Sequence, residues 1–290
     1  MSEVRQVTAD TLRGWPLPEP GDNKEQRGEL VVVGGTATTP GAVLLAAEAA
    51  LRAGAGKLAV ATAASAAVQV AVLLPEAQVW GLPEDSAGNI DPRATDQLLE
   101  HLGEGDTVLI GSGFVDPEAS AALLARLVPE LDATVVLDAL ASAYVTEAPE
   151  RLAEVRSSFL MSINPKELGK TLRRESGSSD DVEADSAELA ERTGAVVLCG
   201  GTDKLVADPT GRQWRISVGG PGLGVSGSGD VQAGIVTGLV ARGAEHAQAA
   251  VWGGYLHGEA GERLAGRVGT VGFLAREIPA EVPAILNSLA

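Results

Sequence analysis

Short apolar segments that alternate with helix-like segments set the strongest limit on how this chain can fold. Residues 30–35 and 56–62 are continuous apolar runs without the inward and outward alternation of a half-exposed strand. Each is followed by an alanine-rich segment with helical spacing, at 40–54 and 64–73. Strands that are apolar throughout are typical of sheets covered on both faces, and strands joined by helices run parallel. We therefore predict an α/β fold with a mostly parallel central sheet between two layers of helices.

The same alternation continues to residue 198 and then changes. Residues 204–207 and 213–217 are predicted to form an antiparallel pair, because the turn sequence Asp208-Pro-Thr-Gly211 joins them. The C-terminal quarter is expected to be helical over 230–242, 244–264 and 273–289. Elsewhere the pattern predicts strands at 77–82, 107–113, 134–138, 159–163 and 195–198, and helices at 92–101, 117–131 and 187–193.

Two segments do not follow this pattern. Residues 1–28, which contain Trp15-Pro-Leu-Pro-Glu-Pro20, are expected to be an irregular N-terminal arm rather than a folded unit. The polar and acidic residues 175–186 are expected to form an exposed, mobile loop. No linker or repeat divides the rest of the chain, so residues 29–290 are predicted to be a single domain.

A glycine-rich segment, residues 219–230, leads directly into an apolar run with helical spacing. The backbone N–H groups of Gly227, Ser228 and Gly229 would lie at the helix N-terminus, where unpaired donors and the positive end of the helix dipole attract a phosphate. Asp230 would be either a helix cap or a general base directed at the bound group. The segment is therefore either a capped helix after a flexible loop or an anion-binding site.

Composition and charge exclude several classes of partner. A formal charge of −17 and an aromatic content of 3% do not fit nucleic-acid binding, which needs clustered cations and stacking aromatics. An anionic small ligand would need local backbone donors or a metal ion. Cys199 is the only cysteine, so we expect neither disulfides nor a Cys/His metal site. The sequence shows no signal-peptide pattern and no apolar run of membrane-spanning length, so we expect a cytoplasmic protein without a membrane partner.

Four candidate sites are expected at one edge of the sheet, because ligands of open α/β sheets bind at the carboxyl ends of the strands. They are residues 34–36, residues 111–113, Asp138 and residues 164–167. Asp138 is interpreted as a cap of the following turn, with metal ligation through water as the alternative. Asn164 and Glu167 have the spacing of a capping box, and they would alternatively hold a hydrated Mg²⁺ next to phosphates.

Other polar side chains are interpreted as structural. Cys199 closes an apolar strand and is expected to be a core residue rather than a nucleophile. Lys204 is interpreted as an exposed strand residue, with a phosphate contact as the alternative. His257 is expected to be a packing residue, and His101 and His246 to be surface residues. Three scattered histidines without a Gly-x-Ser-x-Gly motif do not indicate a hydrolase triad.

Taken in chain order, these segments resemble the ADP/ATP-dependent NAD(P)H-hydrate dehydratase family, ribokinase-like enzymes that repair hydrated nicotinamide cofactors. The resemblance runs from about Gly28 to the C-terminus and is strongest at residues 41–56, 221–235 and 257–261. Gly-Ser-Gly-Asp at 227–230 belongs to the wider superfamily of sugar and vitamin kinases. The preceding Pro-Gly-Leu and the Gly-Ala-Gly at 54–56 narrow the resemblance from this superfamily to the dehydratase family. The resemblance implies a ribokinase-like three-layer α/β/α sandwich.

The resemblance also implies roles for individual residues. Asp230 would be the catalytic base, and Mg²⁺ would lie near Glu167, bound through water. The nicotinamide hydrate would contact Ala42, Gly111, Gly113, Asn164 and Asp230. The adenine nucleotide would contact Cys199, Gly200, Gly201, Thr202, Asp203, Gly227, Ser228 and Gly229.

The chain departs from the family pattern at the ligand-facing edge. The family's substrate-contacting histidine is Asn164 here, and the lysine of its nucleotide loop is Cys199. Its Gly-Pro-Gly-Leu motif has become Gly-Ser-Gly-Phe at 111–114, and its Asp-Ala-Asp-Ala-Leu motif has become Asp-Ala-Leu-Ala-Ser at 138–142.

The family's chemistry implies that ATP or ADP phosphorylates the C6 hydroxyl of hydrated NADH or NADPH (NADHX or NADPHX) and that phosphate is then eliminated. Two alternatives remain open. One is a kinase of a hydroxymethylpyrimidine, thiazole or sugar that stops at phosphorylation, and the other is a non-catalytic member that only binds nucleotide. The resemblance further suggests a homotetramer, for which the small-residue helix at 41–54 would offer a flat face.

Overall fold

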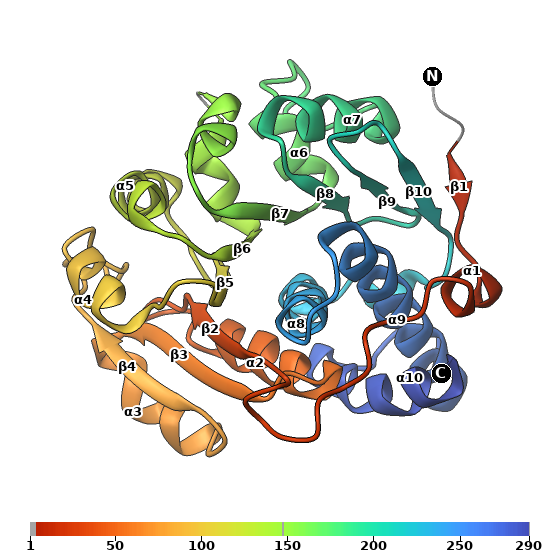
Figure 1. The fold of residues 1–290 in the computed structure, drawn as a ribbon, viewed down its shortest axis with the longest axis horizontal. Helices are drawn as coiled ribbons and strands as arrows, with labels where there is room; N and C mark the ends of the chain where they lie inside the picture. Colours follow the sequence, from red (N-terminus) through yellow and green to blue (C-terminus); the bar gives the residue numbers. More distant parts are fainter. Residues whose placement is uncertain (1–3, 147, 290) are drawn as a thin grey trace.

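The computed structural model describes residues 4–146 and 148–289, and within them the strands form one ten-stranded sheet (Figure 1). The strand order is β1-β10-β9-β8-β7-β6-β5-β2-β3-β4. Strand β9 is antiparallel to both neighbours and every other pair is parallel, which confirms the predicted mostly parallel sheet and its antiparallel pair. The strands are β1 (Arg5–Gln6), β2 (Glu29–Val33), β3 (Lys57–Ala63), β4 (Gln78–Leu82), β5 (Thr107–Ile110), β6 (Thr134–Asp138), β7 (Ser158–Ile163), β8 (Val196–Cys199), β9 (Lys204–Ala207) and β10 (Gln213–Ile216).

Helices cover both faces of the sheet, as the apolar strands predict (Figure 1). Helices α2, α3, α8, α9 and α10 lie on one face, and α4, α5, α6 and α7 lie on the other. None of the described helices is long and apolar enough to cross a membrane. The helices are α1 (Ala9–Arg13), α2 (Gly41–Ala53), α3 (Ala64–Leu73), α4 (Ala94–His101), α5 (Pro117–Leu127), α6 (Pro165–Thr171), α7 (Val182–Thr193), α8 (Ser228–Ala241), α9 (His246–Arg267) and α10 (Val282–Leu289).

Short 3-10 turns extend or replace several of the predicted elements. The helix predicted at 117–131 ends at Leu127 and continues as such a turn, and the segment predicted at 273–289 contains two turns before α10. The strand predicted at 107–113 ends at Ile110. The turns are η1 (Val128–Glu130), η2 (Ala139–Val145), η3 (Pro149–Glu154), η4 (Pro221–Leu223), η5 (Ala275–Glu277) and η6 (Pro279–Glu281).

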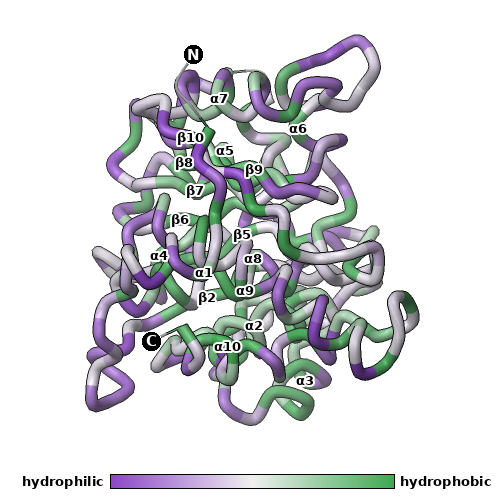
Figure 2. Tube along the Cα trace, turned by 90° about the vertical axis from the view of Figure 1, so that its right-hand side faces the viewer, coloured by the Kyte–Doolittle hydropathy of each residue, from purple (hydrophilic) through white to green (hydrophobic). Residues whose placement is uncertain are grey.

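The sheet divides the core into two apolar clusters. Leu30 and Val32 of β2 belong to the cluster that contains α2, α8 and α9, whereas Val31 and Val33 belong to the cluster that contains α5 and α7. Successive strand residues point to opposite faces, so a strand that is apolar at every position can be buried on both sides. Figure 2 shows hydrophobic residues along the inner elements and hydrophilic residues in many of the peripheral loops.

Helix α8 lies against α2 with almost no side-chain volume between them. A methyl group added at Gly234 of α8 would lie 2.1 Å from the carbonyl oxygen of Ala46 in α2. Ala46 and Ala50 of α2 are fully buried. The small-residue face at 41–54 therefore packs inside the chain, which corrects the expectation that it is a free flat surface.

Residues 4–28 contain two short regular elements, so the expectation of a wholly irregular arm is wrong in this part. Strand β1 pairs in parallel with β10, and α1 follows with a capping box at Thr8. The segment also docks on the domain, because the ring of Trp15 stacks on Trp214 at 5.8 Å and Trp252 Nε1 donates to the Trp15 carbonyl at 2.9 Å. Pairing and aromatic burial are long-range contacts that local composition does not reveal.

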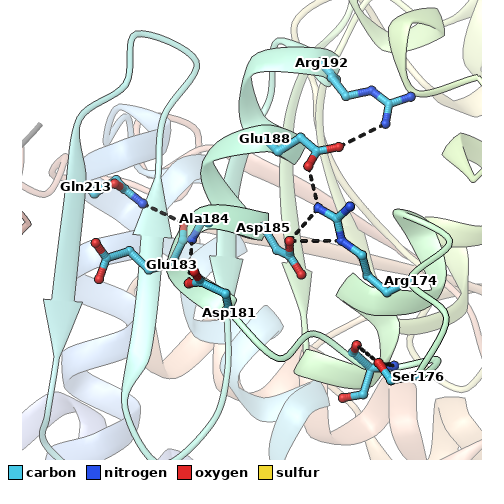
Figure 3. A network of polar contacts seen from close by, with 10 residues as sticks. Arg174, Ser176, Asp181, Glu183, Ala184, Asp185, Glu188, Arg192 and Gln213 are labelled. Carbon is cyan, nitrogen blue, oxygen red and sulfur yellow. Dashed lines mark hydrogen bonds and ion pairs between the residues drawn. The ribbon is translucent and has the colours of Figure 1, made fainter. Parts of the chain in front are cut away.

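The acidic segment 175–186 is also more regular than its composition predicts. Helix α7 begins at Val182, and the carboxylate of Asp181 caps it by accepting from the Ala184 amide at 3.1 Å. Figure 3 shows Arg174 reaching across to Asp185 and Glu188 of α7. Arg174 neutralises acidic residues that would otherwise repel one another, so the second half of the expected loop is helical.

The contact between α2 and α8 predicts that Gly234→Ala destabilises the protein. The added methyl group would force the helices apart, at an expected cost of about 1–3 kcal/mol in the free energy of unfolding, measured by urea denaturation. The matched control is Gly266→Ala in α9, where an added methyl group meets nothing within 4 Å. This control should be neutral or more stable by up to about 1 kcal/mol. Equal stability of the two variants would contradict the tight contact.

Candidate active site

A cavity of about 790 Å³ lies at the carboxyl ends of β6, β7 and β8, beside the N-terminus of α8. This is the edge of the sheet at which the sequence predicts a ligand site. The cavity brings together candidate residues from four separate parts of the chain. The predicted residues among its described lining are Asp138, Asn164, Glu167, Gly200, Gly201, Thr202, Gly227, Ser228, Gly229 and Asp230.

The other candidate residues lie outside this described lining. Ala42 and Gly113 are neighbours, since a methyl group at Gly113 would lie 2.9 Å from Ala42 Cβ, and Gly111 packs on the backbone of Asp138. Cys199 is fully buried, and burial raises the pKa of its thiol to about 12, which fits the predicted core role. Asp203 pairs with Arg215 at 3.4 Å.

The N-terminus of α8 presents backbone donors to the cavity. Gly227 has a φ of +89°, a left-handed conformation that glycine adopts without strain, and α8 starts at the next residue. The sequence predicts a free amide at Ser228, but this amide donates to the Val225 carbonyl at 3.1 Å. Among the described residues, nothing accepts from the amides of Gly227 and Gly229, which leaves two donors for an anion.

Asp230 lies in the first turn of α8 near two further polar side chains that matter for its charge. The Ser112 hydroxyl donates to Asp138 Oδ2 at 2.8 Å. Burial raises the pKa of Asp230 to about 6; the nearby Ser112 hydroxyl opposes this rise and the charge of Glu167 adds to it. Burial and repulsion by Asp230 raise the pKa of Asp138 well above its usual range. Asp230 is therefore a carboxylate that is ionised at neutral pH and basic enough to accept a proton.

Asp138 does not cap the turn that follows β6, contrary to the favoured interpretation. Its side chain makes no capping hydrogen bond, because it accepts from Ser112 instead. Ser112 replaces the proline that the resemblance expects at this position, and nothing in the local sequence signals that its hydroxyl reaches the carboxylate of Asp138. The signal available was its place between two glycines at the end of β5.

Asn164 and Glu167 form the capping box that their spacing predicts. Asn164 Oδ1 accepts from the Glu167 amide at 3.0 Å, and Glu167 Oε2 accepts from the Asn164 amide at 2.9 Å. Burial raises the pKa of Glu167, and the bonds from Asn164 oppose that rise. One carboxylate oxygen of Glu167 is thus committed to the cap, and the other is available to a hydrated cation at the cavity wall.

Two residues that the sequence analysis treats as structural line the cavity. Lys204 is buried rather than exposed, and its Nζ donates to the Val218 carbonyl at 3.1 Å. His257 is buried as expected, but its Nε2 also lies 2.9 Å from the Ser228 hydroxyl. The available signal for Lys204 was its place at the start of an otherwise apolar strand, soon after the two glycines at 200–201.

The architecture matches solved structures of ribokinase-like proteins. A ribokinase-like superfamily protein from Enterococcus faecalis superposes with a TM-score of 0.77 at 22% identity, over 99% of this chain and 96% of that one. The ADP/ATP-dependent NAD(P)H-hydrate dehydratase of Bacillus subtilis, co-crystallised with ATP and Mg²⁺, superposes with a TM-score of 0.84 at 22% identity, over 100% of both chains. The fold is therefore the ribokinase-like α/β/α sandwich.

Sequence similarity narrows this class to one family. The sequence pattern of NAD(P)H-hydrate dehydratases matches residues 30–284. The ADP-dependent (S)-NAD(P)H-hydrate dehydratase of Xanthomonas campestris is 45% identical over 289 residues, which cover 99% of this chain and 97% of that protein. The chain belongs to the NAD(P)H-hydrate dehydratase family.

The position of Ser112 predicts that Ser112→Ala raises the pKa of Asp230 above about 6, because the variant loses the nearby hydroxyl that lowers this pKa. The carboxyl ¹³C chemical shift of Asp230, followed by NMR over pH 4–9, measures this change without a substrate. Ser120→Ala is the control, since Ser120 is also buried but donates to the Asp116 carbonyl at 2.6 Å in α5. An unchanged titration in Ser112→Ala would show that the hydroxyl does not govern Asp230.

Proposed function

We propose that this chain dehydrates hydrated NADH and NADPH, using ADP or ATP as the phosphoryl donor. Membership of the family and the 45% identity to an ADP-dependent relative support the reaction class. The observation that carries the proposal is the position of Asp230. It lies in the first turn of a glycine-led helix, at the wall of a large cavity, with a pKa near 6.

The first step would transfer the terminal phosphoryl group of the nucleotide to the C6 hydroxyl of the hydrate. Asp230 would take the hydroxyl proton as the new P–O bond forms and the bond to the leaving nucleotide breaks. The free amides of Gly227 and Gly229 would stabilise the charge on the transferred group. A carboxylate with a pKa near 6 is suited to this task, because it is ionised at pH 7 yet is a stronger base than an exposed aspartate.

The second step would eliminate phosphate. The lone pair of the ring nitrogen expels it as the C6–O bond breaks, and loss of a proton from C5 restores the reduced nicotinamide. Phosphate is a much better leaving group than hydroxide, which is why a nucleotide is consumed in a dehydration. This scheme requires the chain to hold the C6 hydroxyl of the hydrated nicotinamide next to Asp230, and it does not require the cavity to close over the nicotinamide ring.

Glu167 is the residue that we propose for holding Mg²⁺, through water. Its uncommitted carboxylate oxygen and the nearby Asp138 and Asp230 supply the hard oxygen donors that this ion prefers. Among the described residues, no three or more His, Cys, Asp or Glu side chains are arranged to hold a metal ion directly. When bound, Mg²⁺ would neutralise phosphate charge.

Several further features are part of the same proposal. Residues 29–290 would act as one catalytic domain, with the N-terminal segment docked on it. Ala42 in the first turn of α2, and Gly111 and Gly113 after the end of β5, would contact the hydrate. The cytoplasmic location is proposed from the sequence pattern and the homotetramer from the family resemblance, and the oligomeric state is measurable by light scattering.

The reaction is tested by mixing the protein with hydrated NADH, Mg²⁺ and either ATP, ADP or no nucleotide, and following the absorbance of reduced nicotinamide. Recovery that depends on a nucleotide supports the dehydratase and identifies the donor. Phosphorylation of another small molecule, without recovery, would favour the kinase alternative. Nucleotide binding without turnover of any substrate would favour a non-catalytic member.

Asp230→Asn is predicted to lower kcat by roughly 10²–10⁴-fold, the range for loss of a general base.

The Asp230→Asn variant should also be more stable than the wild type at pH 8. A carboxyl whose pKa rises on folding contributes most stability below its unfolded pKa, and that contribution is lost as the pH rises through about 6. The difference in melting temperature should therefore shrink towards pH 4. Asp96→Asn, an exposed position in α4, is the control; full activity in Asp230→Asn would remove the residue from its role.

A further inference from the structure

Lys204, the first residue of β9, is a buried lysine with few partners. Its exposed fraction is 2%, and its one described hydrogen bond is the donation from Nζ to the Val218 carbonyl at 3.1 Å. An ammonium group has three donors, and the described carboxylates form no ion pair with this one. Burying a charge with a single neutral partner is costly, so a purely structural role is a poor explanation for it.

The surroundings of Lys204 are shaped to admit its side chain. Methyl groups added at Gly219 and Gly258 would lie 3.4 Å and 3.2 Å from its Nζ, and one added at Gly254 would lie 3.5 Å from its Cδ. The contact with Nζ is tight only at Gly258, and the nearest neighbours of these added methyl groups are Leu223, Ile216 and the Val218 carbonyl. The side chain therefore lies along α9 in a channel of glycines, with its charged end beside the cavity.

Lys204 differs in charge from the ionisable residues around it in the cavity. Among the described residues that line it, Lys204 is the only lysine or arginine, whereas Asp138, Glu167 and Asp230 are acidic. The whole chain carries a formal charge of −17. An anionic ligand that enters this cavity meets net repulsion everywhere except near Lys204 and the N-terminus of α8.

His257 supplies a second unsatisfied polar group at the same place. Its Nδ1 is buried and has no described partner, and its Nε2 lies 2.9 Å from the Ser228 hydroxyl at the start of α8. Burial, reinforced by the charge of Lys204, lowers the pKa of His257 to about 3, so the ring is neutral. When Ser228 donates to Nε2, the proton of the neutral ring is on Nδ1, which is then a free donor.

We infer that Lys204 binds a phosphate group of a cavity ligand, with His257 as a neutral hydrogen-bond donor beside it. This inference rests on the proposed function, in which Lys204 would supply the positive charge next to the bound phosphate. A phosphate oxygen would satisfy the free donors of the ammonium group and of the ring, which no described protein acceptor does. The phosphate would come either from the adenine nucleotide or from the diphosphate of the hydrated dinucleotide.

The pH dependence of binding follows from the groups around Lys204. Burial lowers its pKa to about 8, while the charges of Glu262 on α9 and Asp203 before β9 oppose that fall. His257 is neutral in this range and does not titrate with it. The ammonium group loses its proton above about pH 8, so affinity for a phosphorylated ligand should fall from pH 7 to pH 9.

The test is Lys204→Met, which keeps the apolar stem and removes the charge. Titration calorimetry of the full chain with ADP and Mg²⁺ at pH 7 should show about 10- to 100-fold weaker binding, as expected for loss of a charged hydrogen bond. If the phosphate belongs to the dinucleotide, the KM for hydrated NADH should rise by a similar factor instead, with kcat less affected. Adenosine, which has no phosphate, should bind wild type and variant alike.

The control is Lys166→Met, an exposed lysine of α6 next to the cavity residues Pro165 and Glu167. It removes the same charge and should leave ADP affinity and KM within about twofold of the wild type. Melting temperatures check folding, and Lys204→Met should be at least as stable as the wild type, because a poorly paired buried charge has been removed.

Unchanged ADP affinity and unchanged KM in Lys204→Met would overturn the inference. Equal loss of adenosine and ADP binding would overturn it as well, since that result indicates a distorted cavity. Failure of the proposed function is a separate result: the wild type would then bind ADP in a Lys204-dependent manner and yet not restore reduced nicotinamide.

Discussion

The site depends on the packing of one helix, α8, against its neighbours. Helix α8 is buried along nearly its whole length and lies in the middle of Figure 1, between α2, α9 and the sheet. Gly234 and Gly238 let it approach the backbone of α2 at Ala46 and Ala50. A helix held this closely cannot shift along its axis without clashes. Its N-terminus, with the free amides and Asp230, is thereby fixed at the carboxyl ends of the central strands.

The electrostatics of the cavity combine features that are individually unfavourable. Asp138, Glu167 and Asp230 repel one another and have raised pKa values, and Lys204 is buried with one hydrogen bond. Each group costs stability in the free protein. Such groups persist at functional sites because a ligand, cation or proton supplies the missing partner. We propose that the cavity places a phosphate between backbone donors and a lysine, and a hydroxyl next to a carboxylate.

Local sequence was a good guide where local forces decide the outcome. The apolar strands implied a covered parallel sheet, and the Asn164 and Glu167 spacing implied a capping box. The same reasoning was wrong where a distant residue decides. The composition of residues 175–186 predicts a mobile loop, but α7 begins within it because Arg174 pairs with acidic residues of that helix. Strand β1 forms because the edge of β10 is free to pair with it.

The sequence by itself determined the fold class, the glycine loop and its aspartate, and the family, because periodicity and motif spacing are local properties of the chain. Only the tertiary structure decided the environment of each side chain. It placed Ser112 between Asp138 and Asp230, buried Lys204 in a channel of glycines, and set the Nδ1 of His257 without a partner beside the cavity. Burial, pKa and hydrogen bonding depend on residues that are far apart in the sequence, so they follow only once the strands and helices have packed.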